Sequence, residues 1–193
     1  MKKEKEAKYL PWLDLEMTGL DPNQQTIIEI ATVITDNQMN VVAEGPVIAI
    51  YQDVGTLDKM ETWSRDTHTK SGLLQRVIDS KITLKEAEEE TLKFLSGYCI
   101  KQQSPLCGNS VYHDRRFLTR YMPTLAAFFH YRNIDVSTVK ELVRRWYPHG
   151  EYDPQKKASH LALDDIRESI RELQYYRERF FMPANGLSGS GKG

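Results

Sequence analysis

Two carboxylates separated by one residue are the first side chains in the chain whose spacing could support chemistry. Asp14 and Glu16 flank Leu15 in a short apolar segment that is typical of a buried strand. Side chains at positions i and i+2 of a strand point to one face, roughly 7 Å apart along the chain. Carboxylates this close raise each other's pKa unless a cation lies between them, and oxygen-only ligands favour Mg²⁺ or Mn²⁺ over zinc. The pair therefore predicts a divalent-metal site, although two acids on a solvated strand end would have the same spacing.

A third acid follows another short apolar segment. Residues 105–109 (Pro-Leu-Cys-Gly-Asn) are typical of a strand and its exit loop, and Asp114 comes next, near the start of an expected helix. The helix dipole favours a negative charge at that position, so Asp114 has a structural explanation as well as a metal-binding one. Arg115 and Arg116 are expected on a solvated face of the same helix.

A histidine and a fourth acid open the last expected helix. Asp165 lies in its first turns, and His160 lies five residues earlier, which on an ideal helix means about 7.5 Å of rise and about 140° of turn. His160 would therefore approach a metal held by Asp165 from the flank. Histidine side chains ordinarily titrate near pH ~6.5, which suits a general base. The alternative is a surface histidine beside acids that complement the helix dipole.

The order of these groups along one α/β chain resembles the DEDD superfamily of 3′–5′ exonucleases, in the branch with a histidine base. The resemblance extends to the oligoribonucleases over about residues 9–182. It rests on segments 12–22 (WLDLEMTGLDP), 28–31 (IEIA), 67–73 (THTKSGL), 107–110 (CGNS), 114–118 (DRRFL), 135–138 (DVST) and 164–170 (DDIRESI). Pro11 departs from the family pattern, which usually has an apolar residue there.

The resemblance implies an RNase H-like exonuclease fold and two divalent metal ions, Mg²⁺ or Mn²⁺. Asp14 would bridge both ions, Glu16 and Asp165 would complete one site, and Asp114 would support the other. His160 would accept a proton from the attacking water. The implied activity is 3′-to-5′ hydrolysis of very short RNA, especially dinucleotides, to 5′-mononucleotides.

The resemblance also implies a substrate pocket. Leu20 would wedge between two bases, and Trp63 and His68 would contact a base and the 5′ end. The 5′ phosphate would be capped by four further residues, two of which come from the partner subunit of a homodimer: Ser110 and Ser137, with Tyr131 and Arg132 from the partner. Trp63 as a core aromatic, Tyr131 as an ordinary strand residue and Ser137 as a helix N-cap remain alternatives.

The elements that must position these residues can be predicted from local patterns. An antiparallel meander is expected first, with strands at 12–15, 26–35 and 41–51 and with Pro11 at the start of the first strand. A capping box at Thr83 and Glu86 opens a helix to about residue 98. Further expectations are a strand at 105–109, a helix at 115–122 ended by Pro123, an extended segment at 131–136, a helix at 137–146 capped by Ser137, and an amphipathic helix at about 159–181. Together these predict an α/β fold with a mixed central sheet flanked by helices.

Composition restricts the class of protein. The chain has 193 residues, of which 40% are hydrophobic, and 26 Lys+Arg against 27 Asp+Glu give a net charge of −1. This composition suits one folded domain, which we expect at 9–182. A polar tail at 1–8 precedes it and a flexible Gly/Ser-rich tail at 183–193 follows it. The chain has no apolar run of roughly 18 residues, so no membrane span is predicted. Two cysteines are too few for a disulfide scaffold. The first residues lack a secretory or transit signal, so a cytoplasmic location is expected.

Several other functions remain compatible with parts of this pattern. An RNase T-like tRNA-trimming enzyme or a DNA proofreading subunit would share the five catalytic residues but lack the Trp63/His68 and Tyr131-Arg132 features. A non-catalytic RNA-binding module of the same fold would be expected to lack at least one of those five residues. A zinc hydrolase is disfavoured because the chain has no comparable His-rich ligand cluster.

Overall fold

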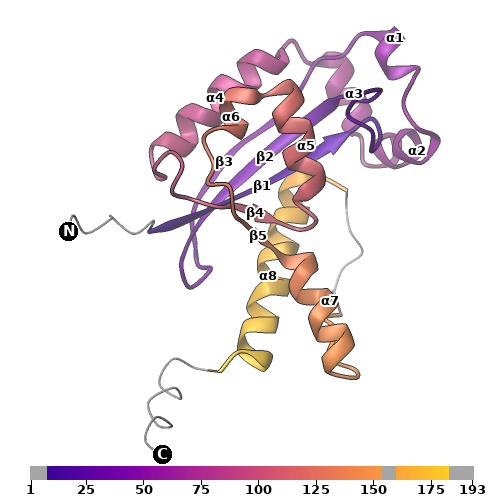
Figure 1. Ribbon diagram of the computed structural model, residues 1–193. Helices are drawn as coiled ribbons and strands as arrows, with labels where there is room; N and C mark the ends of the chain where they lie inside the picture. Colours follow the sequence, from indigo (N-terminus) through magenta and orange to yellow (C-terminus); the bar gives the residue numbers. More distant parts are fainter. Residues whose placement is uncertain (1–7, 154–159, 183–193) are drawn as a thin grey trace, which may run out of the picture.

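The computed structural model describes residues 8–153 and 160–182, and the predicted terminal tails lie almost wholly outside this part of the chain. The sheet contains five strands in the order β3-β2-β1-β4-β5 (Figure 1). Strands β1, β2 and β3 form the expected antiparallel meander, and β4 and β5 add parallel to β1. The strand bounds are β1 Tyr9–Met17, β2 Ile27–Asp36, β3 Val41–Ala49, β4 Leu106–Gly108 and β5 Asn133–Asp135. The predicted mixed α/β sheet is therefore confirmed.

Eight helices surround the sheet in the described residues. Their bounds are α1 Val54–Leu57, α2 Thr62–Lys70, α3 Leu73–Asp79, α4 Leu84–Ser96, α5 Tyr112–Tyr121, α6 Pro123–Ala126, α7 Val136–Trp146 and α8 Ala162–Phe180. No helix in this part of the chain is long and apolar enough to cross a membrane.

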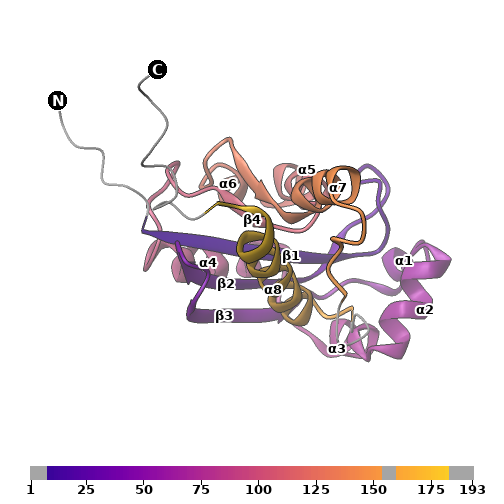
Figure 2. The same cartoon turned by 90° about the horizontal axis from the view of Figure 1, so that it is seen from below.

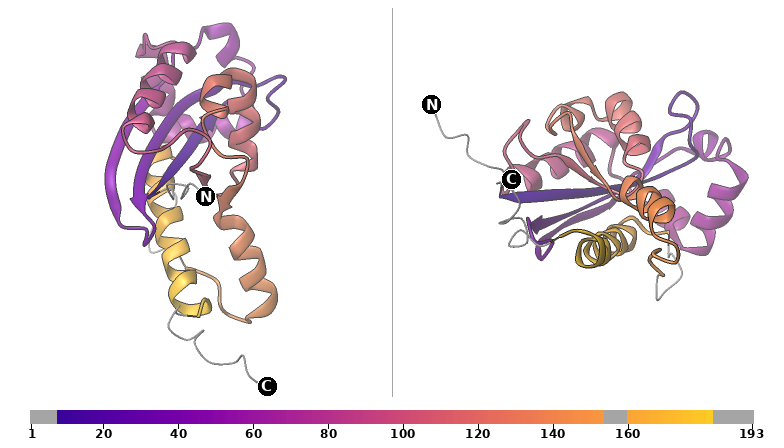
Figure 3. Two further views of the ribbon diagram at one scale, coloured as in Figure 1. Left: turned by 60° about the vertical axis from the view of Figure 1, so that its left-hand side comes forward. Right: turned by 60° about the horizontal axis from the view of Figure 1, so that its bottom comes forward.

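Helices cover both faces of the sheet. On one face α8 packs against β1 and β2, with α7 beside it, and on the other α4 packs against β3 and β2 (Figure 3). The short helices α1, α2 and α3 gather at one end of the sheet (Figure 2). Strand β2 is buried along almost its whole length because it lies in the interior of the sheet between these layers.

The alternation of side chains along β1 divides the core into two parts. Leu13 and Leu15 point into the cluster formed with α4, α5 and α6, whereas Trp12 points into the cluster formed with α7 and α8. Period-2 alternation then places Asp14 and Glu16 on the same face as Trp12. The helix that faces these carboxylates is therefore α8.

Two details of the predicted elements were wrong. Pro11 does not begin the first strand, which starts at Tyr9, and Pro11 pairs with Ile34 of β2. On its other side β1 pairs with the short β4 at Trp12 and not at Pro11. Pro11 therefore does not need a backbone N–H to donate to a strand there. Ser137 does not cap α7, because the N-cap is Asp135, whose carboxylate accepts the Ser137 N–H.

Local patterns placed α4 and α8 well but gave no expectation for α1, α2 and α3. Thr83 and Glu86 form the complete predicted capping box at the start of α4. In α2 the buried residues are Ser64 and His68, so this helix has no apolar stripe for a periodicity argument to detect. Both cysteines are free and buried, as their number suggested.

Gly108 offers a test of how closely β4 approaches β1. A Cβ at this position would lie 2.8 Å from Val111 Cγ1 and 2.9 Å from the Leu13 carbonyl oxygen. We expect Gly108→Ala to lower the free energy of unfolding by about 1–3 kcal/mol, since backbone would have to shift. Urea denaturation measures this, with Gly97→Ala as the control, because Gly97 has an ordinary helical φ of −72°. Equal stability of the two variants would contradict the close approach.

Candidate active site

Three carboxylates from two elements converge at the face of the sheet covered by α8. Asp14 and Glu16 come from β1, and Asp165 comes from the first turns of α8. One carboxylate oxygen from each lies within 4.8 Å of those of the other two. All three side chains are partly buried, so the cluster remains partly accessible to solvent. The predicted convergence of Asp14, Glu16 and Asp165 is thus present in the fold.

Asp114 approaches the same strand from the other side. It is buried in the first turn of α5, and its Oδ1 accepts a hydrogen bond from the Leu15 backbone N–H at 3.0 Å. This contact joins residues 99 positions apart and ties α5 to β1 between the two carboxylate-bearing positions. Asp114 is not part of the three-acid cluster, but its charge is the largest Coulombic contribution to the pKa of Asp14.

Burial raises the pKa of every acid in this group, and nearby negative charges raise it further. Burial raises the pKa of Asp14 well above its ordinary value, and the charges of Asp114, Glu16 and Asp165 raise it further. Burial, then Asp165, raises the pKa of Glu16 to about 8. Burial raises the pKa of Asp114 to about 7 despite its hydrogen bond from Leu15, and that of Asp165 to about 6 despite the nearby His160.

These shifts test whether a metal suits the site. Closely spaced acids with raised pKa values are unfavourable as anions in the protein alone, and a divalent cation reverses this by favouring the charged forms. The donors are all carboxylate oxygens, which matches the preference of Mg²⁺ and Mn²⁺. The residues present therefore fit a divalent-metal site.

His160 lies at the edge of the acidic cluster. Its charge acts on the pKa of Asp165, and its ring meets the Trp63 ring edge-to-face with centroids 5.5 Å apart. The backbone at His160 has a left-handed φ of 51°, an unusual conformation for a residue other than glycine. Trp63 itself is 66% exposed, so its ring is at the surface and not in the core.

His68 is buried next to Glu16 and does not lie at the surface. It is only 1% exposed, its Nε2 is 3.0 Å from the Met17 carbonyl oxygen, and its Nδ1 is 3.9 Å from Glu16 Oε2. Burial lowers the pKa of His68. In this structure its contacts are with the strand end and with the Glu16 carboxylate.

Leu20 projects from the turn that follows β1 and is 57% exposed. Glu61 holds this turn: its carboxylate accepts the Leu20 N–H at 3.3 Å, and its own N–H donates to the Thr18 carbonyl at 2.9 Å. A Cβ at Gly19 would clash with the Glu61 side chain, which would then have to move away from the turn.

Asp135 brings Ser110 and Ser137 together. Its Oδ1 accepts the Ser110 N–H at 2.9 Å, the Ser137 N–H at 3.0 Å and the Ser137 hydroxyl at 2.7 Å. Tyr131 is 74% exposed, with the Arg132 guanidinium 5.3 Å from its ring centre. Among the contacts of the described residues, none joins Tyr131 or Arg132 to the acidic cluster.

Sequence reasoning missed two acids near these groups, Asp135 and Glu29. Asp135 had a local signal, since an Asp two residues before a Ser at a helix start is a common N-cap arrangement. Glu29 had a different one, since it is a single charge in an otherwise apolar strand segment. Neither signal indicates which partner the carboxylate meets.

The fold is similar to that of solved exonucleases. Exonuclease I of Methylocaldum szegediense matches with a TM-score of 0.67 and 18% identity over 89% of this chain. E. coli exonuclease I in complex with a dT13 oligonucleotide matches with a TM-score of 0.66 and 14% identity over 91% of this chain. The chain spans about two fifths of those proteins (41% and 42%). The model of a family described as Exonuclease (RNase_T) matches residues 12–173, so the chain is a nuclease of the exonuclease class.

Two similar relatives narrow this class. The oligoribonuclease of Marinobacter nauticus is 61% identical over 172 residues, covering 89% of this chain and 96% of that protein. The oligoribonuclease of Haemophilus ducreyi is 58% identical over 173 residues, covering 90% and 94%. The chain belongs to the oligoribonuclease family.

The raised pKa values predict how stability should depend on pH. Glu16 has a pKa of about 8 in the folded protein, whereas a glutamate in an unfolded chain titrates near ~4.3. Between these values the folded state holds more protons than the unfolded state, so stability falls as pH rises. We expect the Tm of the metal-free protein to fall across this window, and Mg²⁺ to raise Tm more at pH 8 than at pH 5.

Calorimetry in EDTA and in MgCl₂ measures both effects. Glu16→Gln is the control, since it removes one of the titrating groups and should reduce the pH dependence without metal. A Tm that rises across the window in EDTA, or a Mg²⁺ effect that is larger at low pH, would contradict the assignment of repelling acids.

Proposed function

We propose that this protein is a 3′-to-5′ exoribonuclease that hydrolyses very short RNA, especially dinucleotides, to 5′-mononucleotides. The observation that carries the proposal is the convergence of Asp14, Glu16 and Asp165 within 4.8 Å, with Asp114 hydrogen-bonded to the strand between the first two. Its family relatives are named oligoribonucleases. The cytoplasmic location expected from the N-terminal sequence belongs to the same proposal.

Two divalent ions, Mg²⁺ or Mn²⁺, would supply charge stabilisation at the scissile phosphate and would activate water there. Asp14 would contribute to both ions, Glu16 and Asp165 to one, and Asp114 to the other. The side chains of this set come from three elements, so the sheet and helices hold the ligands before substrate arrives. Such preorganisation lets the protein stabilise developing charge without rearrangement.

His160 is proposed to accept a proton from the attacking water. It flanks the acidic cluster and stands next to Trp63, which limits the positions its ring can take. Its backbone is left-handed, with a φ of 51°, two residues before α8 begins. Strained residues of this kind occur disproportionately at functional sites.

The substrate would lie between the exposed apolar side chains near the site. Leu20 would separate two bases, and Trp63 would provide a stacking surface, since aromatic rings bind bases of any identity. His68 is proposed to contact the substrate near the base and its 5′ end. In this structure its contacts are with Glu16 and Met17. A short substrate needs no long basic track, which agrees with a net charge of −1.

The 5′ phosphate would be capped by Ser110 and Ser137, with Tyr131 and Arg132 supplied by the partner subunit of a homodimer. Asp135 already places the two serines together. Tyr131 and Arg132 are exposed and lie against each other, so a partner subunit could reach both. Such a cap would exclude longer strands and favour dinucleotides.

A time course on a labelled dinucleotide and on a long single-stranded RNA, with and without Mn²⁺, tests the activity. Metal-dependent release of mononucleotides mainly from the dinucleotide is expected, and Asp14→Asn should abolish it. Faster turnover of the long strand would favour an RNase T-like enzyme. No turnover with Mn²⁺ would favour a non-catalytic RNA-binding module.

We expect His160→Ala to lower kcat by roughly 10²–10⁴, the range for loss of a general base, with a small effect on KM. The matched control is His149→Ala, because His149 also has a left-handed φ, of 64°, but is exposed, whereas His160 is half-buried. Steady-state kinetics on the dinucleotide separates kcat from KM. An effect mainly on KM would make His160 a substrate contact instead of a base.

We expect Arg132→Ala to erode the preference for dinucleotides. Loss of a hydrogen bond to a charged phosphate costs about 1.5–3 kcal/mol, so the ratio of kcat/KM for a dinucleotide over a longer RNA should fall tenfold or more. Arg145→Ala is the control, since Arg145 is exposed and pairs with Glu141 on its own helix. An unchanged ratio would refute the cap.

A further inference from the structure

Glu29 is a buried carboxylate that none of the roles above uses. It lies in β2, pairs across the sheet with Glu16 of β1, and is 0% exposed. Its charge raises the pKa of Asp14, Glu16 and Asp165, so it lies within the field of the acidic cluster. A further negative charge here is unfavourable unless it is paired and hydrogen-bonded.

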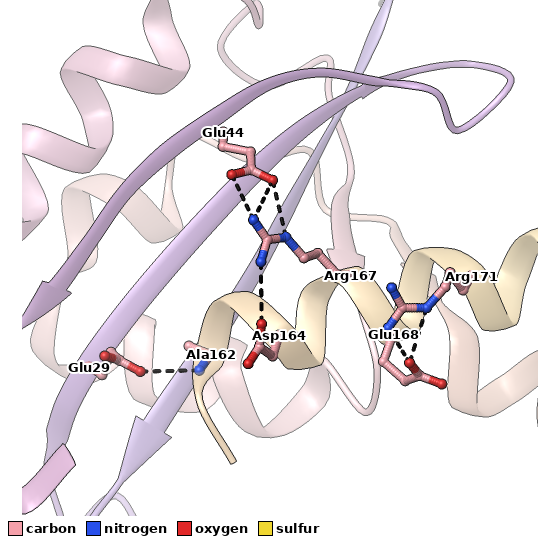
Figure 4. Close-up of polar contacts among 7 residues, drawn as sticks. All are labelled: Glu29, Glu44, Ala162, Asp164, Arg167, Glu168 and Arg171. Carbon is pink, nitrogen blue, oxygen red and sulfur yellow. Dashed lines mark hydrogen bonds and ion pairs between the residues drawn. The ribbon is translucent and has the colours of Figure 1, made fainter. Parts of the chain in front are cut away.

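Both oxygens of Glu29 have a partner on a different element. Oε1 lies 2.6 Å from Arg76 Nη1, on α3, in an ion pair. Oε2 accepts a hydrogen bond from the Ala162 backbone N–H at 3.1 Å, as drawn in Figure 4. The carboxylate thus joins β2, α3 and the beginning of α8.

The contact with Ala162 provides a hydrogen-bond acceptor that the N-cap residue of α8 does not provide. Ala162 is the first residue of α8, and its N-cap, Leu161, has no side chain that could accept a hydrogen bond. The first N–H groups of a helix require partners from outside the helix. Glu29, 133 residues away in sequence, provides one and also places a negative charge at the positive end of the helix dipole.

The position of Ala162 determines what this contact can control. His160 precedes it by two residues and Asp165 follows it by three, so the anchored N–H lies between the proposed base and a proposed metal ligand. Helix α8 is otherwise held further along, for example by the ion pair between Arg167 and Glu44 of β3 at 2.8 Å (Figure 4). Glu29 contacts the end of α8 that carries the chemistry, where Leu161 also packs on an apolar cluster and His160 meets Trp63.

We propose that Glu29, held in place by Arg76, is a positioning residue that fixes the start of α8 against β1 and so sets the placement of Asp165 and His160 around the metal site. This inference rests on the proposed function. It assigns to Arg76 the role of orienting and compensating the Glu29 carboxylate. Residues that orient metal ligands in this way typically change metal affinity or activity 10–100-fold when replaced.

The test compares Mn²⁺ affinity, by isothermal titration calorimetry, in the wild type and three variants. Glu29→Gln weakens the ion pair with little change of shape. Arg76→Met removes the cation but keeps a long side chain. Glu44→Gln is the matched control, because it breaks a different Glu–Arg pair, which joins β3 to α8 at Arg167. Far-UV circular dichroism and Tm confirm that each variant is folded.

Positioning predicts that Glu29→Gln and Arg76→Met both weaken Mn²⁺ binding about tenfold or more, whereas Glu44→Gln stays within twofold. A purely electrostatic role predicts opposite signs: removing the Glu29 charge would weaken cation binding, and removing the Arg76 charge would tighten it. In the positioning case, kcat at saturating Mn²⁺ should also fall for both variants, with KM for the dinucleotide nearly unchanged.

Tighter or unchanged Mn²⁺ binding in Arg76→Met would overturn the inference. Should Glu29→Gln not fold, Arg76→Met decides alone, because Arg76 is partly exposed and its loss leaves no large cavity. Wild-type protein that binds Mn²⁺ but does not cleave RNA would refute the proposed function, while the ratios of Mn²⁺ affinity would still decide the role of Glu29.

Discussion

Repulsion between buried carboxylates is the constraint on which the rest of this structure depends. Asp14, Glu16 and Asp165 are held within 4.8 Å, and burial together with their neighbours' charges raises the pKa of each. Left to themselves these groups would separate or take up protons. The scaffold must therefore supply enough rigidity to keep them together, and a divalent cation then converts the repulsion into binding.

That rigidity comes from contacts made outside the cluster. Strand β1 lies between β2 and β4, and its alternating side chains commit Leu13 and Leu15 to one core, which orients the acids to the other face. Helix α8 is held by its apolar stripe and by ion pairs to neighbouring elements along its length. The acids oppose this arrangement when they are charged, so the apolar layers must hold them in position.

Much of this architecture could be predicted from local patterns. The meander followed from β-branched segments, α4 from its capping box, and α8 from its apolar spacing. Helices α1, α2 and α3 could not be found in this way, since α2 buries Ser64 and His68 instead of an apolar stripe. Its buried His68 lies next to Glu16, a contact that no local pattern predicted.

The sequence by itself determined which groups could act: the types, order and spacing of Asp14, Glu16, Asp114, His160 and Asp165, and the strands and helices that carry them. These depend on neighbouring residues, and local propensity expresses them directly. Only the tertiary structure decided which partners distant groups would meet: Asp114 with the Leu15 N–H, Glu29 with Arg76 and Ala162, and Asp135 with the Ser110 N–H. These contacts span long stretches of sequence and depend on the register and packing of the whole sheet, which no local pattern encodes.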